Sequence, residues 1–147
     1  MEQAMHITLV RIIFILCLSV FAVSVTAHTP PEDARVFFIG LTDGAVVSTP
    51  LKVKFGIEKF GITPAGTKDK RRHTAGHHHL LLDLKQLPDL DQPIPRDDHH
   101  IHFDRGETEA LLDLSPGKHT LQLLLGDETH EPHDPPLISE KITITVE

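Results

Sequence analysis

The chain has 147 residues and a formal net charge of −7 at pH 7, which argues against a nucleic-acid-binding protein. It contains no tryptophan and no tyrosine, so it lacks the aromatic side chains on which sugars and bases commonly stack. Cys17 is its single cysteine, which excludes an internal disulfide, and both methionines precede it. A transition-metal site beyond this point must therefore use imidazole, carboxylate or backbone ligands.

The first 27 residues predict a cleavable export signal. Arg11 precedes an apolar run over 12–25, and the small residues around Ala27 suit a signal peptidase. An uncleaved anchor is the alternative, because the apolar segment is almost long enough to span a bilayer, and it would then be the only membrane contact. We expect a signal peptide at 1–27, a leader at 28–34 and one exported, periplasmic domain at 35–147.

The rest of the chain predicts an all-β domain without a sustained helical period. The segment 51–57 alternates apolar and polar residues, as a half-buried strand does, and Ile142, Ile144 and Val146 share one face of the last strand. The expected strands are 35–40, 51–57, 76–84, 99–104, 108–114, 118–125 and 138–146. About seven short strands separated by turns favour an immunoglobulin-like antiparallel β-sandwich.

Two of the predicted connections are long, residues 59–75 and 85–98. The first contains a basic cluster, Lys68, Lys70, Arg71 and Arg72, and the second contains three prolines and several aspartates. Long loops on a compact domain are often functional, although solvated or disordered connections are the alternative.

Histidine is the most informative residue type in this sequence. The chain has 12 histidines, and all except His6 and His28 lie in 73–133. Imidazole is the commonest metal ligand in proteins and titrates near neutral pH. These ten are His73, His77, His78, His79, His99, His100, His102, His119, His130 and His133.

The usual sandwich connectivity would bring several of these histidines to one end of the domain. The third strand begins there with His77 and His79, which share a face about 7 Å apart. The fourth strand ends there after His102, and the loop following the sixth strand contributes His130 and His133. We expect these five side chains to bind Cu(II) or Zn(II). Carboxylates such as Asp104 or Asp127 could complete a zinc site, whereas His119 starts a strand at the opposite end.

His28 is a sixth candidate ligand. Cleavage after Ala27 would make it the N-terminal residue, whose amine and ring nitrogen can chelate copper together. This arrangement is similar to the copper-binding termini of periplasmic copper carriers and histidine-brace oxygenases. The alternative is that His28 belongs to a flexible leader.

The other histidines have simpler explanations. His78 lies on the apolar face of its strand and is expected in the core, and His99 and His100 can pair with Asp97 and Asp98. The whole cluster could also stabilise loops instead of binding a metal.

Four motifs occur in order along the chain: GHHHLLLD at 76–83, HF at 102–103 with GETE at 106–109, PGKHTL at 116–121 and HEPH at 130–133. This set resembles the bacterial exported family known as domain of unknown function 4399, over about Val36 to Val146. The resemblance implies a small periplasmic or surface domain and brings no established activity. It does not account for His28, His99 or His100.

The leading hypothesis is therefore an exported periplasmic metal-binding protein with a histidine-ligated Cu(II) or Zn(II) site, whose binding should weaken below about pH 6 as imidazoles become charged. The alternative is a non-catalytic envelope module whose histidines stabilise loops or sense pH and whose loops contact an envelope protein. A third hypothesis is an enzyme, either a zinc-hydroxide hydrolase or a copper oxygenase that uses His28, but no nucleophile motif is recognisable, which favours a binding protein.

Overall fold

The computed structural model describes residues 29–68 and 74–147, and every regular element in them is a β-strand. The predicted signal segment, His28, His73 and most of the basic cluster lie outside the described residues. No helix of the described part is long and apolar enough to cross a membrane. The strands are β1 Arg35–Ile39, β2 Val46–Val47, β3 Leu51–Glu58, β4 Gly61–Ile62, β5 Ala75–Leu82, β6 His100–His102, β7 Glu109–Leu112, β8 Gly117–Gly126 and β9 Ile142–Val146.

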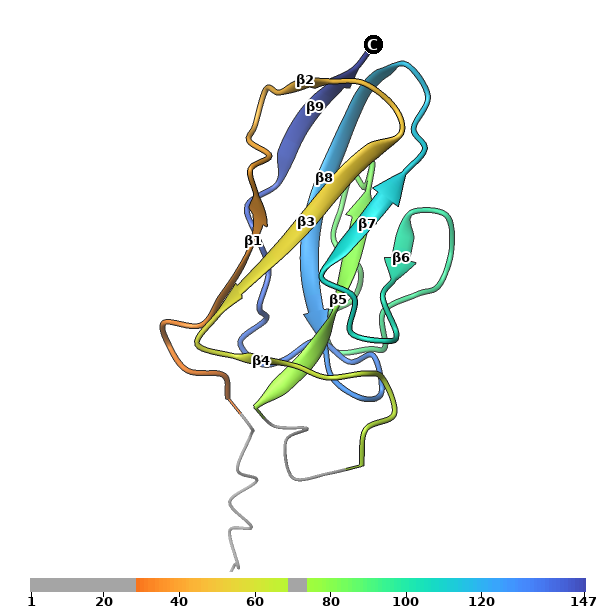
Figure 1. The fold of residues 1–147 in the computed structure, drawn as a ribbon. Coiled ribbons are helices and arrows are strands. Elements are labelled where there is room, and N and C mark those ends of the chain that lie inside the picture. Colours follow the sequence, from red (N-terminus) through yellow and green to blue (C-terminus); the bar gives the residue numbers. More distant parts are fainter. Residues whose placement is uncertain (1–28, 69–73) are drawn as a thin grey trace, which may run out of the picture.

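The strands form two sheets, which Figure 1 shows as two layers. One sheet has the order β1-β3-β7, and the other has the order β2-β9-β8-β5-β4 with β6 also paired to β5. The all-β prediction is confirmed, and each of the seven expected strands has a counterpart. The purely antiparallel prediction is wrong, because β2–β9 and β4–β5 are parallel pairs. Both are two-residue strands within connections: β2 lies between β1 and β3, and β4 lies between β3 and β5.

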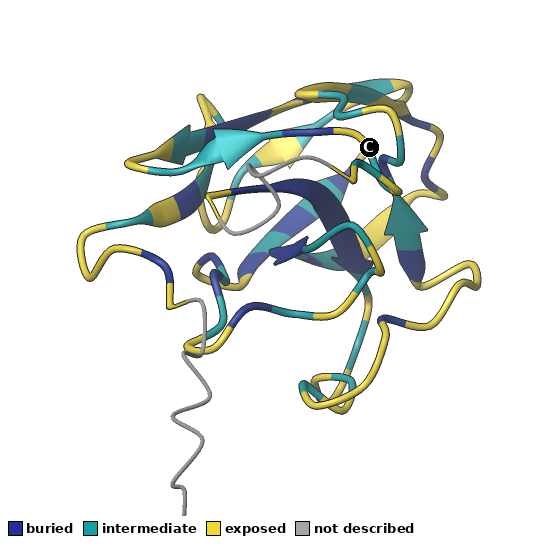
Figure 2. Cartoon of the chain, turned by 90° about the horizontal axis from the view of Figure 1, so that it is seen from below, coloured by how far each residue is buried: buried dark blue, intermediate teal, exposed yellow. Residues whose placement is uncertain are grey.

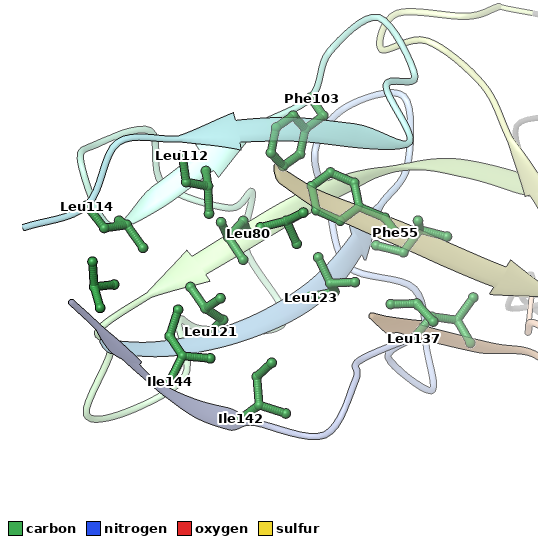
Figure 3. Close-up of a cluster of buried hydrophobic side chains, with 14 residues drawn as sticks. Phe55, Leu80, Phe103, Leu112, Leu114, Leu121, Leu123, Leu137, Ile142 and Ile144 are labelled. Carbon is green, nitrogen blue, oxygen red and sulfur yellow. The ribbon is translucent and has the colours of Figure 1, made fainter. Parts of the chain in front are cut away.

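The hydrophobic core lies between the two sheets (Figure 3). Val53 and Phe55 of β3 face Leu80, Leu121 and Leu123 of the second sheet, and all five side chains are buried. Every second residue of β9 also points into this core, as its apolar parity predicted. Each fully buried leucine contributes about 2 kcal/mol through removal of apolar surface from water.

Strand β5 is buried on both faces, whereas a strand of a two-layer domain usually exposes its outer face to solvent. The outer face is covered by residues 83–99 and 127–141, where Ile94 packs against Leu81 and Leu124 in a second apolar cluster. Figure 2 shows the buried strands surrounded by exposed connections. The outward-facing His77 and His79 are therefore enclosed, with 0% of each residue exposed.

Candidate metal centre

Three loops meet at the end of the domain where β5 begins and β8 ends, the lower end in Figure 1. Ala65 of the β4–β5 connection donates its backbone N–H to the carbonyl of Asp104, which follows β6, at 2.8 Å. The next residue, Gly66, donates to the carbonyl of Glu128 in the β8–β9 loop at 2.9 Å. The predicted convergence of these loops is therefore confirmed.

The inner part of the cluster consists of His77, His79 and His130. The first two project from β5 with ring centroids 4.5 Å apart, and the third comes from the β8–β9 loop. Nδ1 of His130 lies 2.9 Å from Nε2 of His77 and 3.4 Å from Nε2 of His79. One ring nitrogen from each residue lies within 4.8 Å of the other two, which is close enough to share one metal ion. We call these residues the inner group.

A second set of donors shares His130 with the inner group. His102, Asp104 and His130 also place one donor atom each within 4.8 Å of the others. Oδ1 of Asp104 lies 3.7 Å from Nδ1 of His102 and 4.0 Å from Nδ1 of His130. The His102 ring also lies against His79, at a centroid distance of 4.3 Å. We call His102, Asp104 and His130 the outer group.

Neighbouring groups orient the outer ligands. Nε2 of His102 donates a hydrogen bond to the carbonyl of Pro95 at 2.7 Å, so its proton is on Nε2 and its lone pair is on Nδ1. Arg96 donates to Oδ2 of Asp104 at 2.7 Å, which leaves Oδ1 directed at the histidines. Nδ1 of His102 and Oδ1 of Asp104 are buried and have no hydrogen-bond partner among the described residues. A hydrogen bond of this kind to the far side of a ligand is typical of metal sites.

The position of His130 is set by a tight turn. Oδ1 of Asp127 accepts hydrogen bonds from the backbone N–H groups of Thr129 and Glu131, at 2.8 and 3.0 Å. His130 adopts a left-handed backbone conformation with φ of 69°, which histidine tolerates better than most residues. Asp127 therefore shapes the loop that presents His130, and it is absent from both donor groups.

Burial keeps the β5 histidines neutral, the form that binds metal. Burial and the neighbouring His130 lower the pKa of His77 to about 4. Burial, together with His77 and His102, lowers the pKa of His79 to about 2. Burial also lowers the pKa of His102. Although burial alone would raise it, the Arg96 guanidinium holds the pKa of the Asp104 carboxyl below its usual value, so this oxygen donor is charged.

The structure therefore brings together four of the six predicted ligands: His77, His79, His102 and His130. His133 is in neither donor group and packs edge-on against Phe60, with centroids 5.0 Å apart. His28 lies outside the described residues. The sequence predicts Asp104 only as a supplementary ligand. Because Asp104 lies two residues after His102 in the predicted strand over 99–104, the two side chains were expected on the same face.

The remaining described histidines are engaged elsewhere. His78 packs on Phe55 in the core, 5.2 Å between centroids, as predicted. His100 pairs with Asp97 at 2.8 Å. The ring of His99 donates to the Leu82 carbonyl at 2.9 Å. His119, at the other end of the domain, pairs with Asp83 at 2.8 Å.

Gly126 leaves the space that the His79 ring occupies. A methyl group at this position would lie 2.7 Å from Cε1 of His79 and 3.3 Å from Cδ1 of Ile94. Gly126→Ala should therefore destabilise the protein by about 1–3 kcal/mol and weaken metal binding, because the ring must move. Urea unfolding and a zinc titration of the same variant would measure both effects. Wild-type values in both experiments would contradict this contact.

Comparison with known families places the whole cluster within one matched domain. The profile of the family described as Domain of unknown function (DUF4399) matches residues 53–147. The chain belongs to the DUF4399 family. The match begins within β3 and runs through β9, so it covers every residue of the inner and outer groups, whereas β1 and β2 lie before it. The predicted family is confirmed, although the match begins later than the resemblance from Val36 suggested. No curated protein and no solved structure matches the chain.

Proposed function

We propose that this DUF4399 protein is an exported, periplasmic metal-binding protein that holds one Cu(II) or Zn(II) ion. His77, His79 and His130 are the principal ligands, and His102 and Asp104 stand beside them. The observation that carries this proposal is the single nitrogen Nδ1 of His130, which faces Nε2 atoms of two other imidazoles at 2.9 and 3.4 Å.

A metal ion explains this contact better than hydrogen bonding does. One Nδ1 atom has either one proton or one lone pair, so it can make one good hydrogen bond with these two neighbours and not two. An ion can accept all three lone pairs at once. In a tetrahedral zinc site with Zn–N bonds of 2.0–2.1 Å, ligand nitrogens stand about 3.3 Å apart, close to the two separations observed.

The donor set favours a borderline divalent ion. Imidazole binds both Cu(II) and Zn(II), and the order of intrinsic affinities places copper first. No cysteine or methionine occurs after Cys17, which argues against a dedicated Cu(I) site. His102 or Asp104 can provide a fourth ligand, as zinc requires.

The proposal extends to location and fold type. The apolar segment before Ala27 supports export, and the strand order of two layers around one core supports an immunoglobulin-like sandwich.

The alternative function is an envelope module with structural histidines. The pairs of His119 with Asp83 and of His100 with Asp97 favour it. These pairs lie outside the inner and outer groups.

A calorimetric titration of the untagged, metal-free protein with Zn²⁺ and with Cu²⁺ tests the proposal. We expect saturation at one ion per chain, with a dissociation constant below about 1 µM, because most of the site is preformed. The matched control is His99→Gln, which removes an exposed imidazole that belongs to neither donor group. It should bind like the wild type.

Failure of the folded wild-type protein to bind either ion would overturn this function. Loss of zinc binding in His99→Gln would also contradict this function, because the ion would then depend on a histidine outside the cluster. Either result would favour the structural alternative.

A further inference from the structure

The two donor groups differ sharply in their access to solvent. The residues His77 and His79 are 0% exposed, and the His102 side chain of the outer group is only 2% exposed, whereas the side chains of His130 and Asp104 are 27% and 41% exposed. An ion arriving from solvent therefore meets Asp104 and His130 of the outer group before it can reach the imidazoles of β5.

The two groups also differ in chemistry. The inner group has three imidazoles in a dry environment, so an ion must lose most of its water to bind there. The outer group has an ionised carboxylate and two imidazoles, of which only the Asp104 and His130 side chains reach solvent, so an ion held there can keep part of its water shell. His130 belongs to both groups and can remain a ligand while the ion changes its other partners.

One short segment holds all three outer ligands. Ile94 donates its backbone N–H to the carbonyl of His130 at 2.9 Å. Pro95 accepts the hydrogen bond from His102, and Arg96 binds Asp104. These three consecutive residues therefore hold the outer ligands in position before an ion arrives. Donors gathered by chance would not be expected to share one supporting segment.

From these observations we propose that the metal centre has two overlapping positions: an outer entry position at His102, Asp104 and His130, and an inner storage position at His77, His79 and His130. The ion enters through the outer position and leaves by the same route. Arg96 is a positioning residue, since it acts through Asp104. This inference rests on the proposed metal-binding function and adds the path by which the ion is exchanged.

Asp104→Asn is the variant that tests the two positions. The inner group stays complete, so the equilibrium affinity for Zn²⁺ should remain within about twofold of the wild type. Zn²⁺ uptake and release should both become slower by about tenfold, because affinity is the ratio of the two rates. Stopped-flow mixing with a chromophoric zinc indicator measures each rate.

Glu109→Gln is the matched control for the loss of one negative charge. This carboxylate is exposed, pairs with Lys52 and belongs to neither donor group. It should leave both rates unchanged. The measurements are repeated at high ionic strength, where general electrostatic attraction is screened but loss of a donor is not.

Four results have distinct meanings. Slower uptake and release at unchanged affinity supports the two positions. Weaker binding caused by faster release alone would overturn them in favour of one site with Asp104 as a permanent ligand, and unchanged rates would overturn them too. A wild-type protein that binds no zinc would instead refute the proposed function itself.

Discussion

Replacing His130 with asparagine should remove tight metal binding while leaving the fold intact. His130 is the one residue shared by the inner and outer groups, so its loss leaves no complete set of three donors in either. We expect the dissociation constant for Zn²⁺ to rise by about 100-fold, equivalent to about 2.7 kcal/mol. The calorimetric titration used for the wild type measures this change.

Asparagine suits this position for two reasons. It is one of the few residues that tolerate a left-handed backbone, and His130 has φ of 69°. The His130 side chain is also partly exposed, so the change should alter the free energy of unfolding by less than about 1 kcal/mol. Denaturant unfolding without metal checks this requirement. A stable His130→Asn protein with wild-type zinc affinity would place the ion elsewhere and refute both donor groups.

Much of the fold could be predicted because its strands have clear parity. The alternation in β3 and β9 identifies their buried faces, and both faces are found in the core. The parallel pairs of β2 and β4 could not be predicted, because two residues are too few to show an alternation. Residues 138–141, expected as strand, form only a bridge from Ile138 to Leu124 before β9 begins.

The site was predictable where it depends on strand order and not where it depends on loop conformation. His77 and His79 share a face by parity, and the strand order brings them to the loop that contains His130. His133 fails to join them because the left-handed conformation at His130 and the packing on Phe60 direct the two rings differently. Spacing in an H-x-x-H motif does not determine these torsions.

The enclosure of the site was equally hidden in the sequence. His77 and His79 face outward from the second sheet and become buried only because residues 83–99 and 127–141 fold over them. These connections have no periodicity from which their path could be read. Enclosure changes the chemistry, because it lowers the pKa of both rings. Protonation of His77 and His79 therefore cannot cause the loss of metal binding that the sequence predicts below pH 6.

Without metal, the protein should lose stability steeply on mild acidification. Burial lowers the pKa values of His77 and His78 to about 4 and of His79 to about 2, from 6.5 in the unfolded chain. At a pH between the folded-state and the unfolded-state pKa values, the unfolded state binds more protons than the folded state. Stability is therefore full above about pH 6.5 and decreases as the pH falls below it.

The expected size follows from the same pKa values. Lowering the pH from about 7.5 to about 5.5 costs about 1.3 kcal/mol per ring, or about 4 kcal/mol for the three rings. His119 acts in the opposite direction. Burial alone would lower its pKa, but its bonds to Asp83 and Ser115 raise it, so its contribution to stability is present below the unfolded pKa and is lost as pH rises. Burial also lowers the pKa values of His102 and His133, which add to the loss in acid. Urea unfolding across this pH range measures the sum, and a flat profile would contradict neutral burial of the β5 histidines.

His78→Leu isolates one of the three rings without touching either donor group. His78 packs on Phe55 in the core, and neither of its ring nitrogens makes a hydrogen bond of good geometry among the described residues. Leucine has a similar volume and no polar atom to desolvate, so the variant should be as stable as the wild type or more stable at pH 7.5. It should also lose part of the acid destabilisation, about 1.3 kcal/mol between about pH 7.5 and pH 5.5, because one fewer buried histidine takes up a proton on unfolding. If His78→Leu instead keeps the full pH dependence, His78 does not contribute to it, and the acid sensitivity belongs to the other buried histidines.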